Sequence, residues 1–149
     1  MELRPARAED LAAVHALIER AYARYIPRIG RRPAPMDDDH AAQIEAGQVT
    51  VLEGDGGDVI LGVLVTELEA DHIHVATVAV DPACHGRGMG RRLLAEAERL
   101  ALVAGVGEVR LFTNEKMTEN LVLYPHLGYR ETGRRTQNGF CRVFFTKDL

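Results

Sequence analysis

Cysteine is scarce in this 149-residue chain, which contains only Cys84 and Cys141. The two are not spaced as a metal-binding or redox pair, so we expect reduced thiols in a cytoplasmic protein. No apolar run is long enough to span a bilayer, and the first residues lack the apolar core of a signal peptide. Neither a disulfide framework nor a membrane-embedded protein is therefore expected.

An excess of positive charge is also missing. The formal net charge is -4 and the isoelectric point is near 5.9, which argues against general binding to nucleic acid or to an anionic membrane. Hydrophobic residues make up 46% of the chain and charged residues 27%, proportions typical of a globular protein. No repeat, linker or low-complexity segment interrupts the sequence, so we expect one domain over residues 1–149.

The hydrophobic pattern predicts a mixed order of strands and helices. The predicted strands cover residues 2–6, 48–53, 59–69, 73–80, 108–114, 129–135 and 140–148. The predicted helices cover residues 11–22, about 39–47, 88–104 and 118–127. Residues 25–39 contain three prolines and a glycine and predict a loop, and residues 54–58 predict a turn. This order indicates an α+β protein with one mixed sheet flanked by helices.

Polar residues at the element boundaries predict caps and a tight turn. Asp10 precedes the first helix and Asp38 or Asp39 the second, and aspartate is a preferred N-cap residue. The pair Asn138-Gly139 lies between the last two predicted strands. Because Asn-Gly is the strongest short hairpin signal, these strands are expected to form a hairpin.

The segment VAVDPACHGRGMGRRLL, residues 78–94, concentrates glycine and arginine where a predicted strand meets a predicted helix. Gly86, Gly88 and Gly90 allow a tight backbone turn that directs several N–H groups toward one point. The first amides of the following helix have no intrahelical acceptors and carry the positive end of its dipole. Three arginines add positive charge nearby, at Arg87, Arg91 and Arg92. The segment therefore predicts a phosphate or pyrophosphate site, although a tight turn without a ligand is the simpler alternative.

Two common phosphate-binding motifs do not fit this segment. A P-loop requires Gly-Lys-Ser/Thr after the turn, whereas Gly90 is followed by Arg91 and Arg92. A dinucleotide-binding fingerprint requires a third glycine where this chain has Arg91.

The segment instead resembles the acetyl-CoA signature of the GCN5-related N-acetyltransferase (GNAT) superfamily, a Gln/Arg-x-x-Gly-x-Gly/Ala turn after an apolar strand. The segment NLVLYPHLGY, residues 120–129, resembles the second motif of that superfamily, in which an asparagine and a tyrosine four residues apart precede Leu-Gly-Phe/Tyr. The resemblance covers essentially the whole chain and is densest over residues 49–129. His85 stands where the superfamily usually has glutamine or arginine. Because phosphate contacts in this turn come mainly from backbone amides, we expect the change to weaken the site rather than abolish it.

The resemblance implies the GNAT fold, a central and mostly antiparallel sheet of about seven strands flanked by about four helices. It implies that the fourth and fifth strands, residues 73–80 and 108–114, splay apart and that acetyl-CoA is the cosubstrate. The pantetheine arm would pair with backbone groups of the fourth strand, as an added strand would, and the pyrophosphate would lie on the amides of residues 86–91. The cofactor-binding residues expected on this basis are Val78, Ala79, Val80, His85, Gly86, Arg87, Gly88, Met89, Gly90, Arg91 and Asn120.

Acetyl transfer to an amine requires a base to deprotonate the amine and benefits from an acid that protonates the departing thiolate. By resemblance, Tyr124 is the acid, and Asn120, one helical turn earlier on the same face, hydrogen-bonds the cofactor arm. A core tyrosine whose hydroxyl is satisfied elsewhere is the alternative. Pro125 follows directly and is expected to disturb the helix, because proline removes a backbone hydrogen bond.

The base is less well defined. Related enzymes often use a glutamate on the fourth strand, and counting back by twos from Val80 places His74 there, with His72 on the same face. Histidine titrates in a suitable range, so His74 is the expected base. Glu67 and Glu69 on the neighbouring strand are weaker candidates, and strand histidines without a catalytic role are the alternative.

A metal site and a covalent route are both disfavoured. His72, His74, Cys84 and His85 include ligand types for zinc, but no carboxylate or second cysteine is spaced to complete a site. A cysteine beside a tight turn is more often inert than nucleophilic, so Cys84 is not expected to carry the acetyl group. We expect no metal.

The acceptor cannot be identified from these residues. Residues 25–39 lie where the superfamily has its variable acceptor-binding segment. The acidic run Asp37–Asp39 could attract a cationic amine or could cap a helix. An amine pocket or the hydrophobic core could contain Tyr22, Tyr25 and Met36. An acidic acceptor or the nucleotide 3′-phosphate could be neutralised by Arg28, Arg31 and Arg32.

The leading hypothesis is an acetyl-CoA-dependent N-acetyltransferase that acts on a primary amine of a small molecule or peptide. The alternative is a non-catalytic acyl-CoA-binding module with a regulatory or interaction role. The presence of both Asn120 and Tyr124 favours the enzyme, because a binding module needs no proton donor. O-acetyl transfer differs only in the acceptor and stays open. By analogy with related enzymes, strand 140–148 could pair with a second copy in a homodimer.

Overall fold

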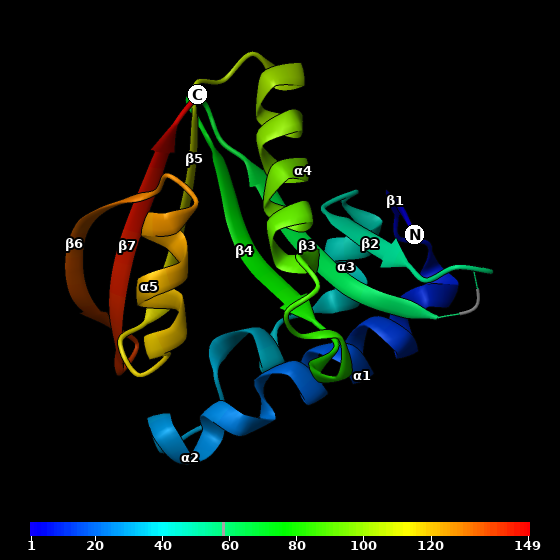
Figure 1. The fold of residues 1–149 in the computed structure, drawn as a ribbon, viewed down its shortest axis with the longest axis horizontal. Coiled ribbons are helices and arrows are strands. Elements are labelled where there is room, and N and C mark those ends of the chain that lie inside the picture. Colours follow the sequence, from blue (N-terminus) through cyan, green and yellow to red (C-terminus); the bar gives the residue numbers. More distant parts are fainter. Residues whose placement is uncertain (58) are drawn as a thin grey trace.

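The computed structural model describes residues 1–57 and 59–149. Seven strands form one sheet in the order β1-β2-β3-β4-β5-β7-β6 (Figure 1). The strands are β1 Glu2–Pro5, β2 Val49–Glu53, β3 Ile60–Leu68, β4 Ile73–Val80, β5 Glu108–Asn114, β6 Arg130–Gln137 and β7 Phe140–Asp148. Asp58, within the predicted turn 54–58, lies outside the described residues.

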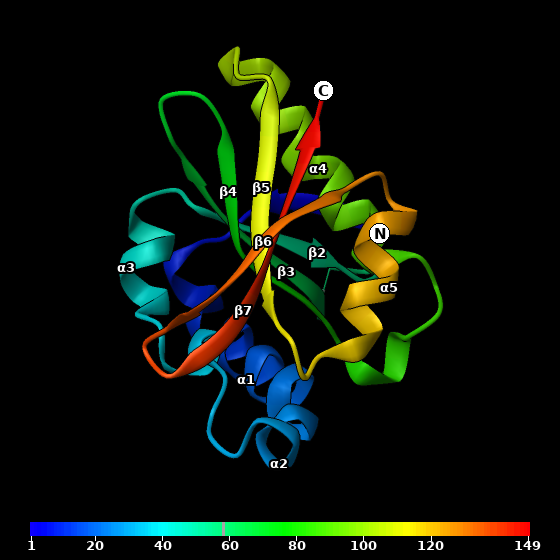
Figure 2. The same cartoon turned by 90° about the vertical axis from the view of Figure 1, so that its left-hand side faces the viewer.

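Helices cover both faces of the sheet. They are α1 Leu11–Tyr22, α2 Ile26–Ile29, α3 His40–Glu45, α4 Met89–Ala104 and α5 Thr118–His126. Figure 2 shows α4 and α5 on one side of the sheet and α3 on the other. Two hydrophobic cores result: α1 buries Val14, Leu17 and Ile18 against one face, and α4 buries Leu93 and Leu94 against the other. This period of three and four residues is the spacing of one helix face.

The sheet is antiparallel except between β4 and β5. These two strands pair in parallel from Ile73↔Val109 to Val75↔Leu111, and their paired positions end there. Figure 1 shows the two strands close together at one end and diverging toward α1 and α2. The mixed sheet with a splayed fourth and fifth strand confirms the expected fold class. The splay matters because it leaves backbone groups of β4 available between two layers of helices.

A β-bulge in β4 changes which side chains share a face. Val65↔Thr77 is followed by Thr66↔Val75, so Ala76 is an extra residue in β4. On one side of the bulge Val75 packs into the α4 core, and on the other side Val78 does so. The period of two is therefore broken at Ala76, and counting back from Val80 does not place His74 on the face that carries Val78.

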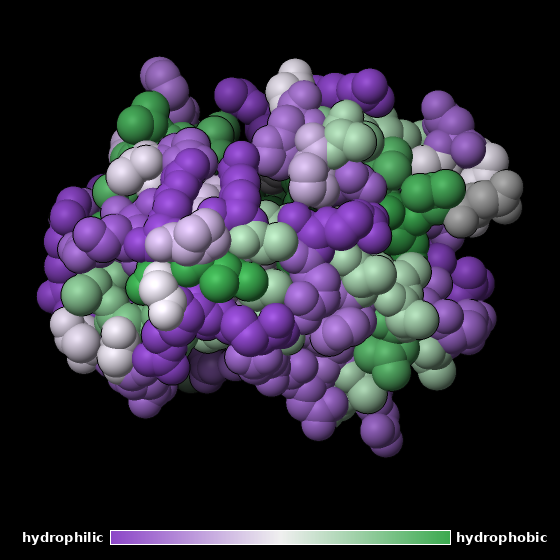
Figure 3. Space-filling model, turned by 90° about the horizontal axis from the view of Figure 1, so that it is seen from below, coloured by the Kyte–Doolittle hydropathy of each residue, from purple (hydrophilic) through white to green (hydrophobic). Residues whose placement is uncertain are grey.

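The proline-rich segment is more ordered than the predicted loop. It contains α2 and a 3-10 turn, η3 Ala34–Asp37, each with proline in its first turn. Proline is tolerated there because the first N–H groups of a helix have no intrahelical acceptor. Figure 3 shows the end of the molecule formed by α1 and α2, where hydrophilic and apolar side chains are mixed over the surface.

The expected caps are partly confirmed. The Asp39 carboxylate accepts the N–H of Ala42 at 3.0 Å and so caps α3. Asp10 does not cap α1: its carboxylate accepts the N–H of Arg7 at 2.7 Å, at the 3-10 turn η1 Ala8–Asp10, and pairs with Arg4. Because this 3-10 turn directly precedes α1, the Asp10 carboxylate accepts a hydrogen bond at the start of the turn instead of at the start of the helix. Asn138 and Gly139 adopt positive φ values of 53° and 80°, as the predicted hairpin turn requires.

Candidate active site

A glycine turn connects β4 to α4. A further 3-10 turn, η4 Pro82–Cys84, follows β4, and the Asp81 carboxylate caps it by accepting the N–H of Ala83 at 3.0 Å. Gly86 and Gly88 then adopt left-handed φ values of 80° and 73°, which side chains with a Cβ rarely adopt. Among the described residues, the N–H groups of residues 86–91 donate to no backbone acceptor. The turn therefore presents a row of free donors at the positive end of α4.

Gly90 differs from the other two glycines of this turn. It lies within α4 at an ordinary φ, and a Cβ added there would meet only a methyl group of Val80, at 4.0 Å. Nothing in the folded chain therefore requires glycine at this position, although glycine costs a helix about 1 kcal/mol relative to alanine. A ligand that approaches the backbone closely at the start of α4 would explain the residue.

A cavity of about 550 Å³ opens between this turn, β4 and α5. It is lined by every residue of the expected cofactor set except the exposed Arg87, namely Val78, Ala79, Val80, His85, Gly86, Gly88, Met89, Gly90, Arg91 and Asn120. We call it the cofactor cavity. Arg92 points elsewhere and donates to the Met1 carbonyl at 2.9 Å.

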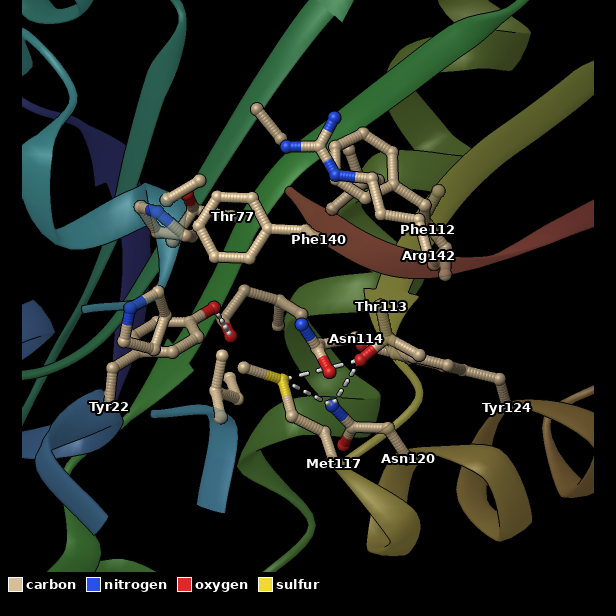
Figure 4. A pocket seen from close by; sticks show the side chains of 18 residues that line it. Tyr22, Thr77, Phe112, Thr113, Asn114, Met117, Asn120, Tyr124, Phe140 and Arg142 are labelled. Atoms are coloured by element: carbon tan, nitrogen blue, oxygen red, sulfur yellow. Dashed lines mark hydrogen bonds between the residues drawn. The ribbon is translucent and has the colours of Figure 1, made fainter. Parts of the chain in front are cut away.

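A second pocket lies at the splay on the other side of the sheet. We call it the acceptor pocket because residues of the segment expected to bind the acceptor line it, a role that stays a prediction. It is bounded by β4, β5, the segment of α2 and η3, and the start of β7 (Figure 4). Four residues line both the cofactor cavity and the acceptor pocket: Tyr22, Val78, Asn120 and Tyr124. The two pockets therefore adjoin at the splay of β4 and β5, and we call this junction, with two tyrosines on its wall, the passage.

Tyr124 is 4% exposed and reaches this passage from α5. Its ring packs against Tyr129 and Phe145, with centroid distances of 5.8 and 5.5 Å. Burial raises the pKa of Tyr124 above its ordinary value, so the phenol is protonated at neutral pH. Pro125 lies inside α5, which ends one residue later at His126.

Asn120 is fixed by contacts to β5 and to the start of α5. Its Nδ2 donates to Thr113 Oγ1 at 3.0 Å and to Met117 Sδ at 3.8 Å (Figure 4). These bonds orient the side chain beside Tyr124, which lies one helical turn later on the same helix. The expected bond from Asn120 to a cofactor arm stays a prediction.

The structure does not bring His74 into either pocket. The His74 ring stacks on Phe112 at 5.5 Å and faces a separate cavity shared with β5, β6 and β7. Burial lowers the pKa of His74 below its ordinary value. His72 lines the same separate cavity, and its Nδ1 lies 2.6 Å from the Asp71 carboxylate. Glu67 is opposite His74 in the sheet register, so it is also away from Tyr124.

The variable segment contributes apolar residues to the acceptor pocket and salt bridges at its exposed side. Tyr25 and Met36, two candidates for the pocket, are 5% and 2% exposed and do not line it, and Tyr25 lines the cofactor cavity instead. Asp37 pairs with Arg32 at 3.0 Å, and Arg28 pairs with Glu119 on α5 at 2.5 Å. The carboxylates and arginines of this segment are therefore largely engaged with one another and with α5.

The residues that sequence reasoning missed come from strands β4, β5 and β7. They are Thr77, Phe112, Thr113, Phe140 and Arg142, all of which line the acceptor pocket. Thr77, Thr113 and Phe140 are buried, whereas Phe112 and Arg142 are half-buried, so burial does not mark them as one group. The splay of β4 from β5 and the pairing of β5 with β7 bring them together, so no local signal identified them.

Neither a metal cluster nor a membrane helix is found in the part of the chain that the structure describes. No group of three or more His, Cys, Asp or Glu side chains is placed there to hold a metal ion. No helix there has the length and apolar character needed to cross a membrane. Cys84 is a buried free thiol, and Cys141 is an exposed one.

Comparison with known proteins identifies the family to which this chain belongs. Residues 45–131, more than half of the chain, match the family described as Acetyltransferase (GNAT) domain. Over 61 residues the chain is 43% identical to the uncharacterized protein ML0378 of Mycobacterium leprae (strain TN). This match covers 41% of the chain, which spans about a sixth (16%) of that protein.

Two solved structures share the fold over nearly the whole chain. PaiA N-acetyltransferase from Thermoplasma acidophilum, solved in complex with coenzyme A, has a TM-score of 0.81 and 16% identity, with 99% of this chain and 98% of that chain covered. YncA from Salmonella typhimurium, solved with its cofactor acetyl-CoA, has a TM-score of 0.73 and 22% identity, with 100% and 94% covered. With the glycine turn, the splayed strands and the family match in agreement, the chain belongs to the GNAT family of acetyltransferases.

Proposed function

We propose that the protein transfers the acetyl group of acetyl-CoA to a primary amine by direct attack. The observation that carries the proposal is the passage at the splay, where the cofactor cavity and the acceptor pocket share Tyr22, Val78, Asn120 and Tyr124. Two molecules that enter from opposite faces of the sheet would meet there. Their reacting atoms would be held together beside a buried phenol, which removes much of the entropic cost of a two-substrate reaction.

The cofactor cavity fits coenzyme A in charge and shape. The free N–H groups of residues 86–91 can donate hydrogen bonds to a pyrophosphate, and the open space beside Gly90 allows it to approach the helix start. Beyond Val75 the edge of β4 that faces β5 has no strand partner, so it can pair with an extended amide-bearing arm, as an additional strand would. Bound acetyl-CoA would supply the acyl group as a thioester.

Tyr124 is the proposed proton donor. The residue lines the passage and its phenol is protonated, so it could donate a hydrogen bond to sulfur as the C–S bond breaks. Because its pKa is raised above that of a thiol, which is about 8.5, the phenol stabilises the departing thiolate mainly by sharing its proton. The thiolate then takes its proton from solvent, and Tyr124 keeps its phenol proton.

The amine must lose one proton as the new C–N bond forms. Among the described residues that line either pocket, one histidine and one carboxylate are candidate bases: His85, in the glycine turn, and Glu119. A hydrogen bond from Arg28 holds the pKa of Glu119 at about 2, which makes it a poor base. We therefore propose that the amine reacts as its neutral form and that its proton passes to water rather than to His74.

A thiol-release assay over a panel of primary amines tests the proposal. Tyr124→Phe should lower kcat by about 10²-fold or more, the usual contribution of a positioned proton donor, while the KM for acetyl-CoA changes little. Tyr129→Phe is the matched control, because its ring packs on Tyr124 but its buried hydroxyl has no hydrogen-bond partner among the described residues. This control should keep kcat near the wild-type value.

Two results would contradict the proposal in different ways. Unchanged kcat in Tyr124→Phe would remove the donor role but leave acetyl transfer intact. Tight binding of acetyl-CoA in calorimetry with no thiol release from any amine would instead favour a non-catalytic acyl-CoA-binding module.

A further inference from the structure

The acceptor pocket combines apolar walls and neutral polar groups with one charged side chain. Its walls include the side chains of Ile29, Pro33, Pro35, Phe112, Met117 and Phe140. Among the described residues that line it, Arg142 alone carries a charge, and none is an acid that could hold a second cationic group of an acceptor. A polyamine would therefore meet an arginine rather than a carboxylate.

Arg142 is positioned by aromatic rings rather than by an acid. Its guanidinium lies over Phe112 at 4.3 Å and near Phe140 at 5.5 Å, and its Nη1 donates to Gln137 Oε1 at 3.0 Å. Within the described part of the chain it forms no ion pair, and Nε and Nη2 donate no hydrogen bond. Asp38 is near enough for its charge to act on Arg142, but without a direct contact. One edge of the guanidinium fork is thus available to an anion.

Thr77 provides a second unsatisfied group on the same pocket. The residue is 2% exposed, and its Oγ1 is buried without a hydrogen-bond partner among the described residues. Thr77 lines the acceptor pocket from β4, directly after the bulge at Ala76. Buried hydroxyl groups are normally hydrogen-bonded, so Thr77 places a polar group without a partner among the described residues in this wall.

The exposed side of the acceptor pocket is bridged by the chain itself. Arg31 Nη1, from the segment between α2 and η3, donates to the Asn138 carbonyl at 2.9 Å, and its guanidinium lies over Phe140 at 4.0 Å. The approach at the hairpin turn is so close that a Cβ on Gly139 would lie 2.6 Å from Arg31 Nη1. This bridge joins two sides of the pocket, which favours a small molecule over a folded protein as the acceptor.

The two ends of the pocket have different chemistry. Figure 4 shows Arg142 and Phe112 on one side of the pocket and Asn120 and Tyr124 on the other. A small molecule with its carboxylate toward Arg142 could direct its amine toward Tyr124, where the acyl group is expected, and place its apolar part against the walls. We propose that the acceptor is a small primary amine that also carries a carboxylate, an amino acid with an apolar side chain, and that Arg142 binds this carboxylate. The inference rests on the proposed acetyl transfer.

Matched pairs of acceptors test this proposal. Phenylalanine is compared with 2-phenylethylamine and leucine with 3-methylbutylamine, with spermidine as a cationic reference and with kcat/KM expressed per neutral amine. Wild-type protein should favour each amino acid by about 10-fold or more, the usual worth of a hydrogen-bonded charge. Arg142→Gln should remove this preference by raising the KM for the amino acid, and Arg142→Lys should keep part of it.

The control is Arg135→Gln. Arg135 is opposite Arg142 in the sheet register and lies over Phe144 at 3.9 Å, but it lines the separate cavity beside His74. It should keep the wild-type preference. Equal kcat/KM for acids and matched amines, a preference for spermidine, or an equal loss for both acceptor types in Arg142→Gln would overturn the proposal.

A binding measurement separates this inference from the proposed function. Absence of thiol release with every amine counts against acetyl transfer, whereas release without a preference for carboxylates counts only against the role of Arg142. In calorimetry with coenzyme A present, N-acetylphenylalanine should bind about 10-fold more tightly than N-acetyl-2-phenylethylamine, and Arg142→Gln should abolish the difference. Equal affinities in wild-type protein would sink the inference whether or not the chain proves to be an enzyme.

Discussion

The hydroxyl of Tyr22 on α1 donates a hydrogen bond to the Val78 carbonyl on β4, with an O–O distance of 3.2 Å. The bond lies where β4 has already separated from β5, beyond the pair Val75↔Leu111. A carbonyl next to the gap would otherwise lack a partner from the sheet. The first helix therefore helps to keep the passage open and forms part of its wall.

Replacing Tyr22 with phenylalanine tests the role of this hydrogen bond. Tyr22→Phe keeps the ring but leaves the Val78 carbonyl unpaired, so the free energy of unfolding should fall by about 1 kcal/mol. The kcat/KM for acetyl-CoA should fall as well, because the same carbonyl lines the cofactor cavity. Urea denaturation and initial rates measure the two effects.

Tyr25→Phe is the control for this change. The Tyr25 hydroxyl accepts a hydrogen bond from the Arg24 side chain at 2.7 Å and is bonded to no strand carbonyl. Its loss should cost less stability, because Arg24 can turn to water. If both variants behave alike, the bond between Tyr22 and Val78 has no special role.

Gly90→Ala separates the stability of α4 from ligand binding. Alanine is the better helix former by about 1 kcal/mol, and its Cβ meets nothing closer than 4.0 Å, so the free energy of unfolding should stay level or rise. The affinity for coenzyme A should fall, because the methyl group would occupy the space where the pyrophosphate is expected. Calorimetry with coenzyme A and thermal unfolding make the comparison.

Gly133→Ala is the matched control for the glycine experiment. This glycine also has open space around its Cβ position, and it lies on β6, three strands away in the sheet order from β4, the strand that leads into α4. It should leave the affinity for coenzyme A unchanged. Equal affinities in wild type, Gly90→Ala and Gly133→Ala would mean that the start of α4 does not hold the phosphates.

The glycine turn could be recognised from sequence because its chemistry is local. Gly86 and Gly88 are required by backbone angles set within a few residues, and the apolar strand and helix on either side have their own periodicity. The acceptor pocket could not be recognised in this way. Arg142 becomes a pocket residue only because β7 inserts between β5 and β6, a pairing that depends on contacts far apart in the chain.

The bulge at Ala76 disrupts the period of two within a single strand. In the run IHVATVAV the larger apolar residues lie at 73, 75, 78 and 80, so their spacing shifts by one residue at Ala76-Thr77, although neither a glycine nor a proline marks the extra residue. The bulge arises from the register against β3, where Val65 and Thr66 face Thr77 and Val75. Its consequence is a change of face for every residue before it, His74 included.

The ion pair between Asp10 and Arg4 predicts a pH-dependent contribution to stability. Hydrogen bonds from Arg4 hold the pKa of Asp10 at about 2, below its ordinary value of 3.8. The contribution is therefore complete above pH 3.8 and is lost as the pH falls through 2. Asp10→Asn should lower the free energy of unfolding by about 2 kcal/mol at pH 7, and the difference should shrink toward pH 2.

Asp37→Asn is the control for the acid experiment. Asp37 also pairs with an arginine, Arg32 at 3.0 Å, but its side chain is 64% exposed. An exposed pair is worth less than about 1 kcal/mol, so this variant should follow wild type at every pH. Urea midpoints measured from pH 2 to 7 provide the test. A constant offset between Asp10→Asn and wild type over that range would show that the carboxylate charge is not the cause.

His74→Gln tests how the amine loses its proton. Loss of a general base costs about 10² to 10⁴-fold in rate, whereas His74 lies behind Phe112 and outside both pockets, so the variant should keep kcat/KM close to wild type. If water takes the proton, kcat/KM should rise with pH as the neutral amine forms, about tenfold per unit below the amine pKa near 10. Because burial lowers the pKa of His74, a catalytic role would instead add an inflection below its ordinary value of 6.5. Such an inflection in wild type that disappears in His74→Gln, together with a large loss of rate, would restore the histidine as the base.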